Sequence, residues 1–99
     1  MIGVKIHSSY RQVIAICDLD LLGKKFEDNQ RQLSVHENFF KEKEMTLEEV
    51  IKLMRNYAKE DATFNIVGPQ SVNAALEAGI IDKDGVATVQ GIPFALVLL

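Results

Sequence analysis

Two segments within the first seventeen residues predict β-strands. Apolar residues occupy positions 2, 4 and 6, with Gly3, Lys5 and His7 between them, which is the period of a half-buried strand. Residues 13–17 form a denser run that is apolar on both faces. Such a run is typical of a strand inside a sheet with other elements packed on each side. We expect an N-terminal hairpin whose second strand lies near the centre of the sheet.

The clearest helix signal begins at Thr46. Thr46 and Glu49 have the spacing of a capping box, in which each side chain accepts a hydrogen bond from the backbone N–H of the other residue. Met45 and Val50 are placed as a hydrophobic staple around this start. Apolar residues then recur on one face as far as Ala58, which predicts an amphipathic helix.

A second strand and helix follow. Residues 63–67 predict a strand, and Pro69 fits the first position of a helix, where its missing N–H costs no hydrogen bond. Gly79 ends the apolar pattern of this helix, and Ile80 stands where a Schellman motif places an apolar contact. Gly23 ends an earlier, shorter helical pattern in the same manner. Both glycines are therefore expected to have a positive φ.

The remaining segments predict short strands and turns. Phe26 and residues 32–35 form two short strands around a polar turn, whereas the charged residues 41–44 form a solvated loop. Residues 86–89 and 93–99 predict a C-terminal hairpin joined by a turn with glycine. Taken together, these elements predict an α+β fold: a small mixed sheet with N-terminal and C-terminal hairpins and two main helices.

The composition fits one domain over residues 1–99. Hydrophobic residues make up 47% of the chain, which is enough for a self-sufficient core at this length. The start of the chain lacks the layout of a signal peptide, and no apolar run approaches membrane-spanning length. The sequence therefore predicts a cytoplasmic protein without a membrane partner.

Charge and cysteine content narrow the chemistry. The net charge of -3 provides no global positive field, so DNA is not expected as a partner. Cys17 is the only cysteine, which excludes a disulfide within the chain. We expect a buried, unreactive thiol there, because Asp18 beside it disfavours a thiolate. His7 and His36 lack the spacing of zinc ligands, so neither a metal nor a cofactor is expected.

Two junctions between a strand and a helix hold the candidate binding residues. Asp18 follows the first apolar run and is placed to cap a short helix, and Gly68 follows the strand at residues 63–67. Functional groups collect beyond the carboxyl ends of strands in such sheets, so we expect both junctions to form one exposed binding surface. Its predicted residues are Asp18, Gly23, Lys24, Asn65, Gly68, Ser71 and Asn73. Helix amides after Gly68 could also bind a phosphate, although a structural helix start is the favoured interpretation.

Five short segments carry a family resemblance. They are AICD at 15–18, LLGK at 21–24, NIVG at 65–68, AGIID at 78–82 and GIP at 91–93. In this order and spacing they resemble a small archaeal family known as domain of unknown function 424, over nearly the whole chain.

The resemblance implies an archaeal, cytoplasmic α+β protein for which no activity is established. It also implies an association with translation components, including a subunit of the archaeal initiation factor that delivers initiator tRNA. Phe94 and Leu96 depart from the family's pattern, because many relatives have polar residues after the proline.

Two functions are compatible with these observations. The first is a non-catalytic binding module that acts on RNA or on a translation initiation factor through the predicted surface. The alternative is a small enzyme, or a nucleotide- or phosphate-binding protein, that uses the junctions at Asp18 and Gly68. General acid–base chemistry needs at least two positioned groups, and the sequence offers no such set. The binding module is therefore favoured.

Overall fold

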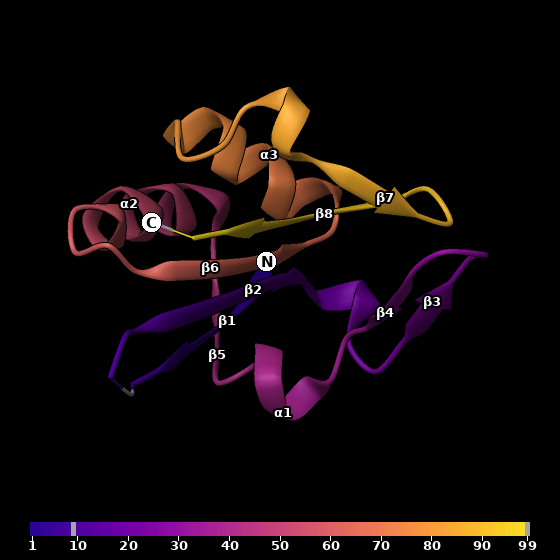
Figure 1. Ribbon diagram of the computed structural model, residues 1–99. Helices are drawn as coiled ribbons and strands as arrows, with labels where there is room; N and C mark the ends of the chain where they lie inside the picture. Colours follow the sequence, from indigo (N-terminus) through magenta and orange to yellow (C-terminus); the bar gives the residue numbers. More distant parts are fainter. Residues whose placement is uncertain (9, 99) are drawn as a thin grey trace.

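The computed structural model describes residues 1–8 and 10–98 and contains a mixed sheet of six strands (Figure 1). These strands are β1 (Ile2–His7), β2 (Val13–Asp18), β5 (Lys43–Met45), β6 (Thr63–Val67), β7 (Ala87–Val89) and β8 (Ile92–Val97). Their order is β5-β1-β2-β6-β8-β7, in which β2 and β6 are parallel and the other neighbours are antiparallel. A separate small sheet pairs β3 (Lys25–Glu27) with β4 (Gln32–Ser34). Both predicted hairpins, β1–β2 and β7–β8, are confirmed.

The two faces of the larger sheet have different covers. α2 (Leu47–Ala58) and α3 (Pro69–Ala78) lie over one face, and α1 (Glu37–Phe40) and the β3–β4 hairpin lie on the other (Figure 1). Two short 3₁₀ turns, η1 (Leu19–Leu21) and η2 (Lys83–Gly85), complete the elements. The α+β fold with two main helices is therefore confirmed.

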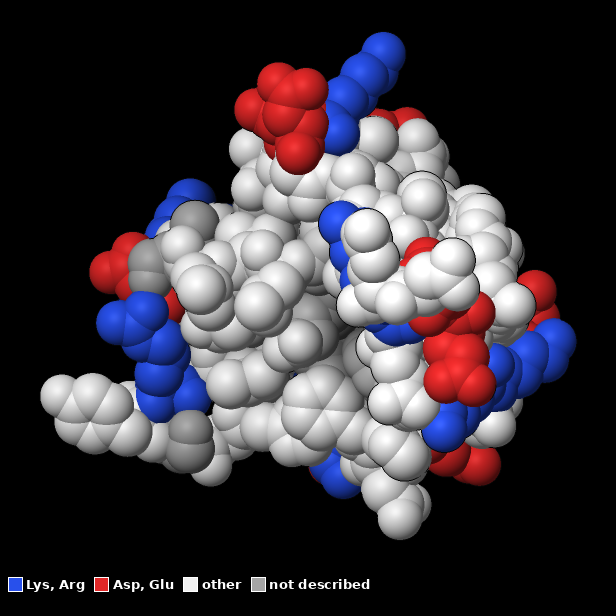
Figure 2. Space-filling model, turned by 45° about the vertical axis from the view of Figure 1, so that its right-hand side comes forward, with Lys and Arg blue, Asp and Glu red and all other residues white. Residues whose placement is uncertain are grey.

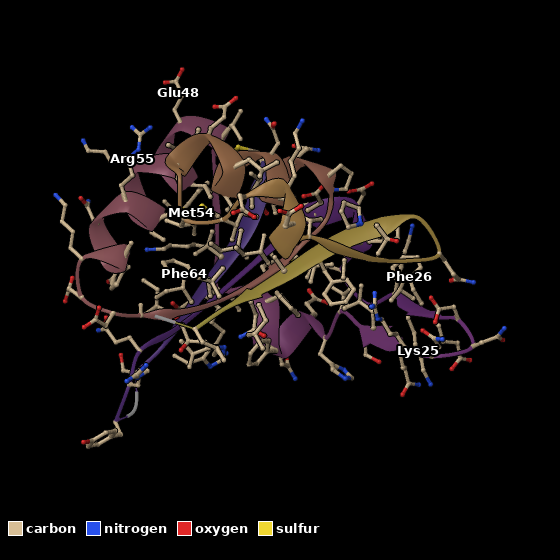
Figure 3. The ribbon with its side chains drawn as sticks, turned by 45° about the horizontal axis from the view of Figure 1, so that its top comes forward. Lys25, Phe26, Glu48, Met54, Arg55 and Phe64 are labelled. Carbon is tan, nitrogen blue, oxygen red and sulfur yellow. The ribbon has the colours of Figure 1, made fainter. Side chains whose placement is uncertain are left out.

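Alternation along the central strand builds two apolar clusters. Ile14 and Ile16 of β2 belong to the cluster under α2 and α3, whereas Ala15 and Cys17 belong to the cluster on the opposite face. Figure 3 shows Met54 of α2 and Phe64 of β6 in the layer between helix and sheet; both are fully buried. Burial of each such side chain contributes about 1.5–3 kcal/mol.

The predicted helix ends have the expected geometry. The Thr46 hydroxyl accepts a hydrogen bond from the Glu49 backbone N–H at 3.2 Å, and the Glu49 carboxylate accepts one from the Thr46 N–H at 2.9 Å. At the end of α3, Gly79 has φ 79° and the Ile80 N–H donates to the Ala75 carbonyl at 3.2 Å, as a Schellman motif requires. Gly23 also has φ 79°. The capping box and both positive φ values are confirmed.

Residues 41–44 differ from the prediction of a solvated loop. Lys43–Met45 form the edge strand β5, and Met45 pairs with Ile2 of β1. Charged side chains are common on an edge strand because they discourage pairing with another chain. The sequence pattern of such a strand therefore resembles that of a solvated loop. The sequence pattern also did not predict α1, whose four residues are too few to show a helical period.

The last strand ends before the predicted limit. β8 ends at Val97, and the predicted strand position of Leu99 lies outside the described residues. Pro93 is the second residue of β8, and its carbonyl accepts a hydrogen bond from the Gly68 N–H at 2.8 Å. The Gly68 carbonyl is used by the Val72 N–H of α3, so the missing N–H of Pro93 leaves no acceptor unpaired. This explains why proline is tolerated next to a central strand.

Loss of the Glu49 charge is expected to lower the free energy of unfolding only at pH values at which that carboxylate is ionised. Hydrogen bonds from Thr46 hold the pKa of Glu49 below its usual value. A lowered pKa in the folded state stabilises it above the unfolded pKa, and this contribution disappears as the pH falls through the folded value. Glu49→Gln should therefore lower the denaturant midpoint at about pH 7 and not at about pH 2. An equal difference at both pH values would contradict this assignment.

Cys17 is expected to react slowly in the native protein. It is fully buried, and burial together with Asp18 and Asp20 raises the pKa of its thiol to about 12. Roughly a thousandfold less thiolate is present than for a free cysteine of ordinary pKa. A thiol reagent at neutral pH should label unfolded chains fast and native chains very slowly. Cys17→Ser should cost about 1–3 kcal/mol, because a hydroxyl there needs a partner; fast native labelling would refute the prediction.

Candidate functional site

Asp18 is the most heavily hydrogen-bonded side chain at the predicted junctions. It is 2% exposed, and its Oδ1 atom accepts hydrogen bonds from the Ser71 N–H and hydroxyl, both at 2.8 Å. Its Oδ2 atom accepts one from the Gln70 N–H at 3.0 Å. Asp18 makes no side-chain cap to η1, the short helix that follows it. The prediction that it caps that helix is wrong, since it caps α3 instead.

The parallel pairing of β2 and β6 explains this contact. Cys17 pairs with Val67, so the next residues along the two strands, Asp18 and Gly68, stand side by side where α3 begins. Gly68 has φ 108°, and a Cβ atom at that position would overlap the Asp18 Cγ atom. Glycine is required on both counts. The carboxylate also lies at the positive end of the α3 dipole, which favours its charge.

The structure divides the predicted binding surface into separate regions. Asp18, Gly68 and Ser71 are buried in the capping contact, so their predicted exposure is wrong. Asn73 is exposed on α3, which covers one face of the sheet.

Asn65 lies on the other sheet face, because its neighbours Phe64 and Ile66 belong to the cluster under the helices. Gly23 and Lys24 are exposed beside β4, where the Gly23 N–H donates to the Val35 carbonyl at 2.7 Å and the Val35 N–H donates to the Lys24 carbonyl at 2.9 Å. The seven residues therefore do not form one continuous surface.

The same contact argues against a phosphate site at the start of α3. A phosphate would need free backbone N–H groups in the first turn of the helix. Pro69 has none, and those of Gln70 and Ser71 already donate to Asp18. The Gly68 N–H donates to Pro93. The amides that the phosphate interpretation requires are thus all accounted for.

A cleft opens on the sheet face that carries Asn65. Its volume is about 330 Å³, and it lies between the β4–α1 segment and strands β6 and β8. Figure 2 shows a broad, hollowed face without charged residues, with Lys, Arg, Asp and Glu side chains at its margin. The cleft lining likewise contains no charged residue: it consists of Gln32, Leu33, Ser34, His36, Phe39, Phe40, Asn65, Ile66, Val67, Phe94, Ala95 and Leu96.

Polar positions of β1 hold one wall of this cleft. The Lys5 Nζ atom donates to the Asn38 carbonyl at 2.8 Å, and the Phe39 carbonyl accepts a hydrogen bond from the His7 Nε2 atom at 2.8 Å. The rings of His7 and Phe39 also stack, with centroids 4.5 Å apart. The alternating polar residues of β1 therefore anchor α1 over the sheet. On the other side, Arg31 donates to the Thr88 carbonyl at 3.4 Å and links the β3–β4 hairpin to β7.

Two features of the lining indicate what it can bind. Asn65 is half-buried, and among the described residues its carboxamide has no hydrogen-bond partner. Leu96, its partner across the β6–β8 pair, is 57% exposed. Within the described part of the chain, no cluster of three His, Cys, Asp or Glu residues could hold a metal ion. The cleft can therefore bind an uncharged group through apolar contact and a few hydrogen bonds.

The sequence pattern located only part of this cleft. Asn65 was among the predicted site residues, whereas Phe39 and the β4 residues were not. Their role depends on the position of α1, which no sequence period reveals. One available signal was the apolar run at positions 94–99, which places Leu96 and Leu98 at alternating positions.

Fold and cleft together define a small α+β protein with a mixed sheet and an uncharged cleft on the face opposite its two main helices. A family model described as "Protein of unknown function (DUF424)" matches residues 6–99, and the chain belongs to this family. The crystal structure of an uncharacterized conserved protein from Methanopyrus kandleri is similar, with a TM-score of 0.85 and 26% sequence identity. The match covers 98% of this chain and 91% of that chain. No curated protein matches. Among the described residues, no helix has the length and apolar character needed to cross a membrane.

Gly68→Ala is expected to destabilise the protein strongly. The methyl group would overlap the Asp18 carboxylate, and alanine resists a φ of 108°. We expect a loss of at least about 2 kcal/mol in the free energy of unfolding. Gly85→Ala is the matched control, because a Cβ there meets nothing within 4 Å. Chemical denaturation of both variants tests this, and equal stability would contradict the capping assignment.

Proposed function

We propose that this protein is a non-catalytic module that binds an apolar segment of a protein partner in the cleft between β4–α1 and β6–β8. The observation that carries the proposal is a concave lining without charged residues whose margin includes an exposed leucine, Leu96. Leu98, which follows the last residue of β8, is 71% exposed. Two exposed leucines beside an uncharged concave lining favour an interaction site.

A protein partner fits the cleft better than RNA does. Binding to an RNA backbone depends on lysine and arginine at the phosphates, and the lining contains neither. The net charge of -3 also opposes a polyanion. The family resemblance adds an association with translation components. A subunit of the initiation factor that delivers initiator tRNA is therefore the partner to test first.

The enzyme alternative has less support in the same cleft. His36 and Ser34 are the lining residues closest in type to a base and a nucleophile. His36 is exposed at the start of α1, and the lining offers no carboxylate to orient its ring. Nucleophilic catalysis normally needs that third group. The cleft is better suited to binding than to hydrolysis.

Leu96→Asp is expected to weaken binding to the purified initiation-factor subunit. A charge placed in an apolar contact must be desolvated, so we expect at least a tenfold loss of affinity by calorimetry. Leu47→Asp is the control, because Leu47 is a partly exposed leucine on α2, away from the cleft. Both variants replace an exposed side chain, so melting temperatures should change little.

Two results would contradict the proposal. One is equal affinity of the Leu96→Asp and Leu47→Asp proteins for the subunit, or no binding by the wild type. The other is salt-dependent binding to initiator tRNA that Leu96→Asp leaves unchanged, which would indicate an RNA partner at another surface.

A further inference from the structure

Asn65 is an unusual residue for its position in the sheet. It lies in the middle of β6, between Ala15 of β2 and Leu96 of β8, on the face that forms the cleft. A half-buried carboxamide stabilises a fold when its donor and acceptor are paired and costs free energy when they are not. Among the described residues nothing pairs with it. The group is therefore available to a molecule that enters the cleft.

The chemistry of the carboxamide restricts that molecule. The side chain of Asn65 presents an N–H donor and a carbonyl acceptor next to each other. A peptide group in an extended chain offers the complementary carbonyl and N–H. The walls around Asn65 contain no Lys, Arg, Asp or Glu, and apolar side chains such as Phe39, Phe94 and Leu96 stand there beside a few polar ones. Asn65 can therefore form hydrogen bonds with a peptide backbone, and the cleft beside it has space for an apolar side chain.

We propose that the cleft binds an extended, uncharged peptide segment of about three residues, with Asn65 hydrogen-bonded to its backbone. The inference rests on the proposed function and specifies its ligand. Three successive residues from each of β4, β6 and β8 line the cleft, at positions 32–34, 65–67 and 94–96. Three residues of extended chain span roughly 10 Å, at about 3.3 Å per residue. A segment of similar length fits alongside them.

A nucleobase satisfies these constraints less well. A base in RNA brings a phosphate on each side, and the lining holds no cation to meet it. Stacking also needs a free aromatic face. One face of Phe39 is already covered by His7, and Phe40 contacts it edge to face, with ring centroids 5.0 Å apart. The apolar segment of a peptide has neither requirement.

Nuclear magnetic resonance with a defined probe tests the inference. The probe is the blocked tripeptide acetyl-Ala-Leu-Ala-amide at millimolar concentration, with acetyl-Ala-Glu-Ala-amide as the charged control and adenosine as the base control. The leucine peptide should shift the side-chain amide signals of Asn65 and the backbone signals of residues 94–96. The glutamate peptide should bind at least tenfold more weakly, because the lining contains no lysine or arginine to pair with its charge.

A pair of variants isolates the backbone contact. Asn65→Leu keeps a similar volume and removes the hydrogen-bonding atoms, so the affinity for the leucine peptide should fall about two- to tenfold. Asn73→Leu, an equivalent change on the exposed surface of α3, should leave it unchanged. Equal affinity in the two variants would overturn the role of Asn65. Stronger shifts with adenosine than with the leucine peptide would overturn the peptide assignment.

Failure of this inference can be told apart from failure of the proposed function. If Leu96→Asp weakens binding to the protein partner but the leucine peptide produces no shift at 94–96, the cleft binds protein in another way and this inference is wrong. If substitutions in the cleft change the affinity for neither the protein partner nor the leucine peptide, both this inference and the proposed function are wrong.

Discussion

The contact between Asp18 and the start of α3 is the constraint on which the rest of this structure depends. One carboxylate joins the end of β2 to the first turn of a helix more than 50 residues along the chain, and it accepts hydrogen bonds from the Gln70 and Ser71 N–H groups, which have no partner within the helix. It requires glycine at position 68, and it depends on the parallel pairing of β2 with β6. In many α/β sheets the junction between a strand and a helix carries functional groups, whereas in this protein the junction holds β2 and α3 together.

Because the N–H groups at this junction already donate to Asp18, the junction offers none of them to a ligand, and the candidate cleft lies on the opposite face of the sheet. There the short helix α1 is held by Lys5 and His7, and the β3–β4 hairpin is linked to β7 through Arg31. Between these covers the sheet remains open beside Asn65 and Leu96. The uncharged character of this opening supports a protein-binding role and disfavours phosphate recognition. Function is thus inferred from what the sheet leaves uncovered.

Local physics explains which expectations from sequence agree with the structure. The capping box at Thr46 and the Schellman motif at Gly79 involve residues a few positions apart, so spacing alone specifies them. Alternation in β1 and the two-sided apolar run of β2 also follow from the period of a strand. The edge strand at Lys43 was missed, since its charged residues suit both a loop and a sheet edge. α1 was missed because four residues show no period.

The sequence by itself determined the class of fold, the two main helices, both hairpins and the burial of Cys17, because these depend on periodicity and on neighbours along the chain. Only the tertiary structure decided the partner of Asp18. A capping carboxylate can serve any nearby helix start, and the parallel register brought Gly68 beside it in place of the helix that follows it in sequence. The tertiary structure also placed Asn65 and Asn73 on opposite sides of the sheet. Strand alternation places a residue on one of two faces, but which face is covered depends on where distant elements pack.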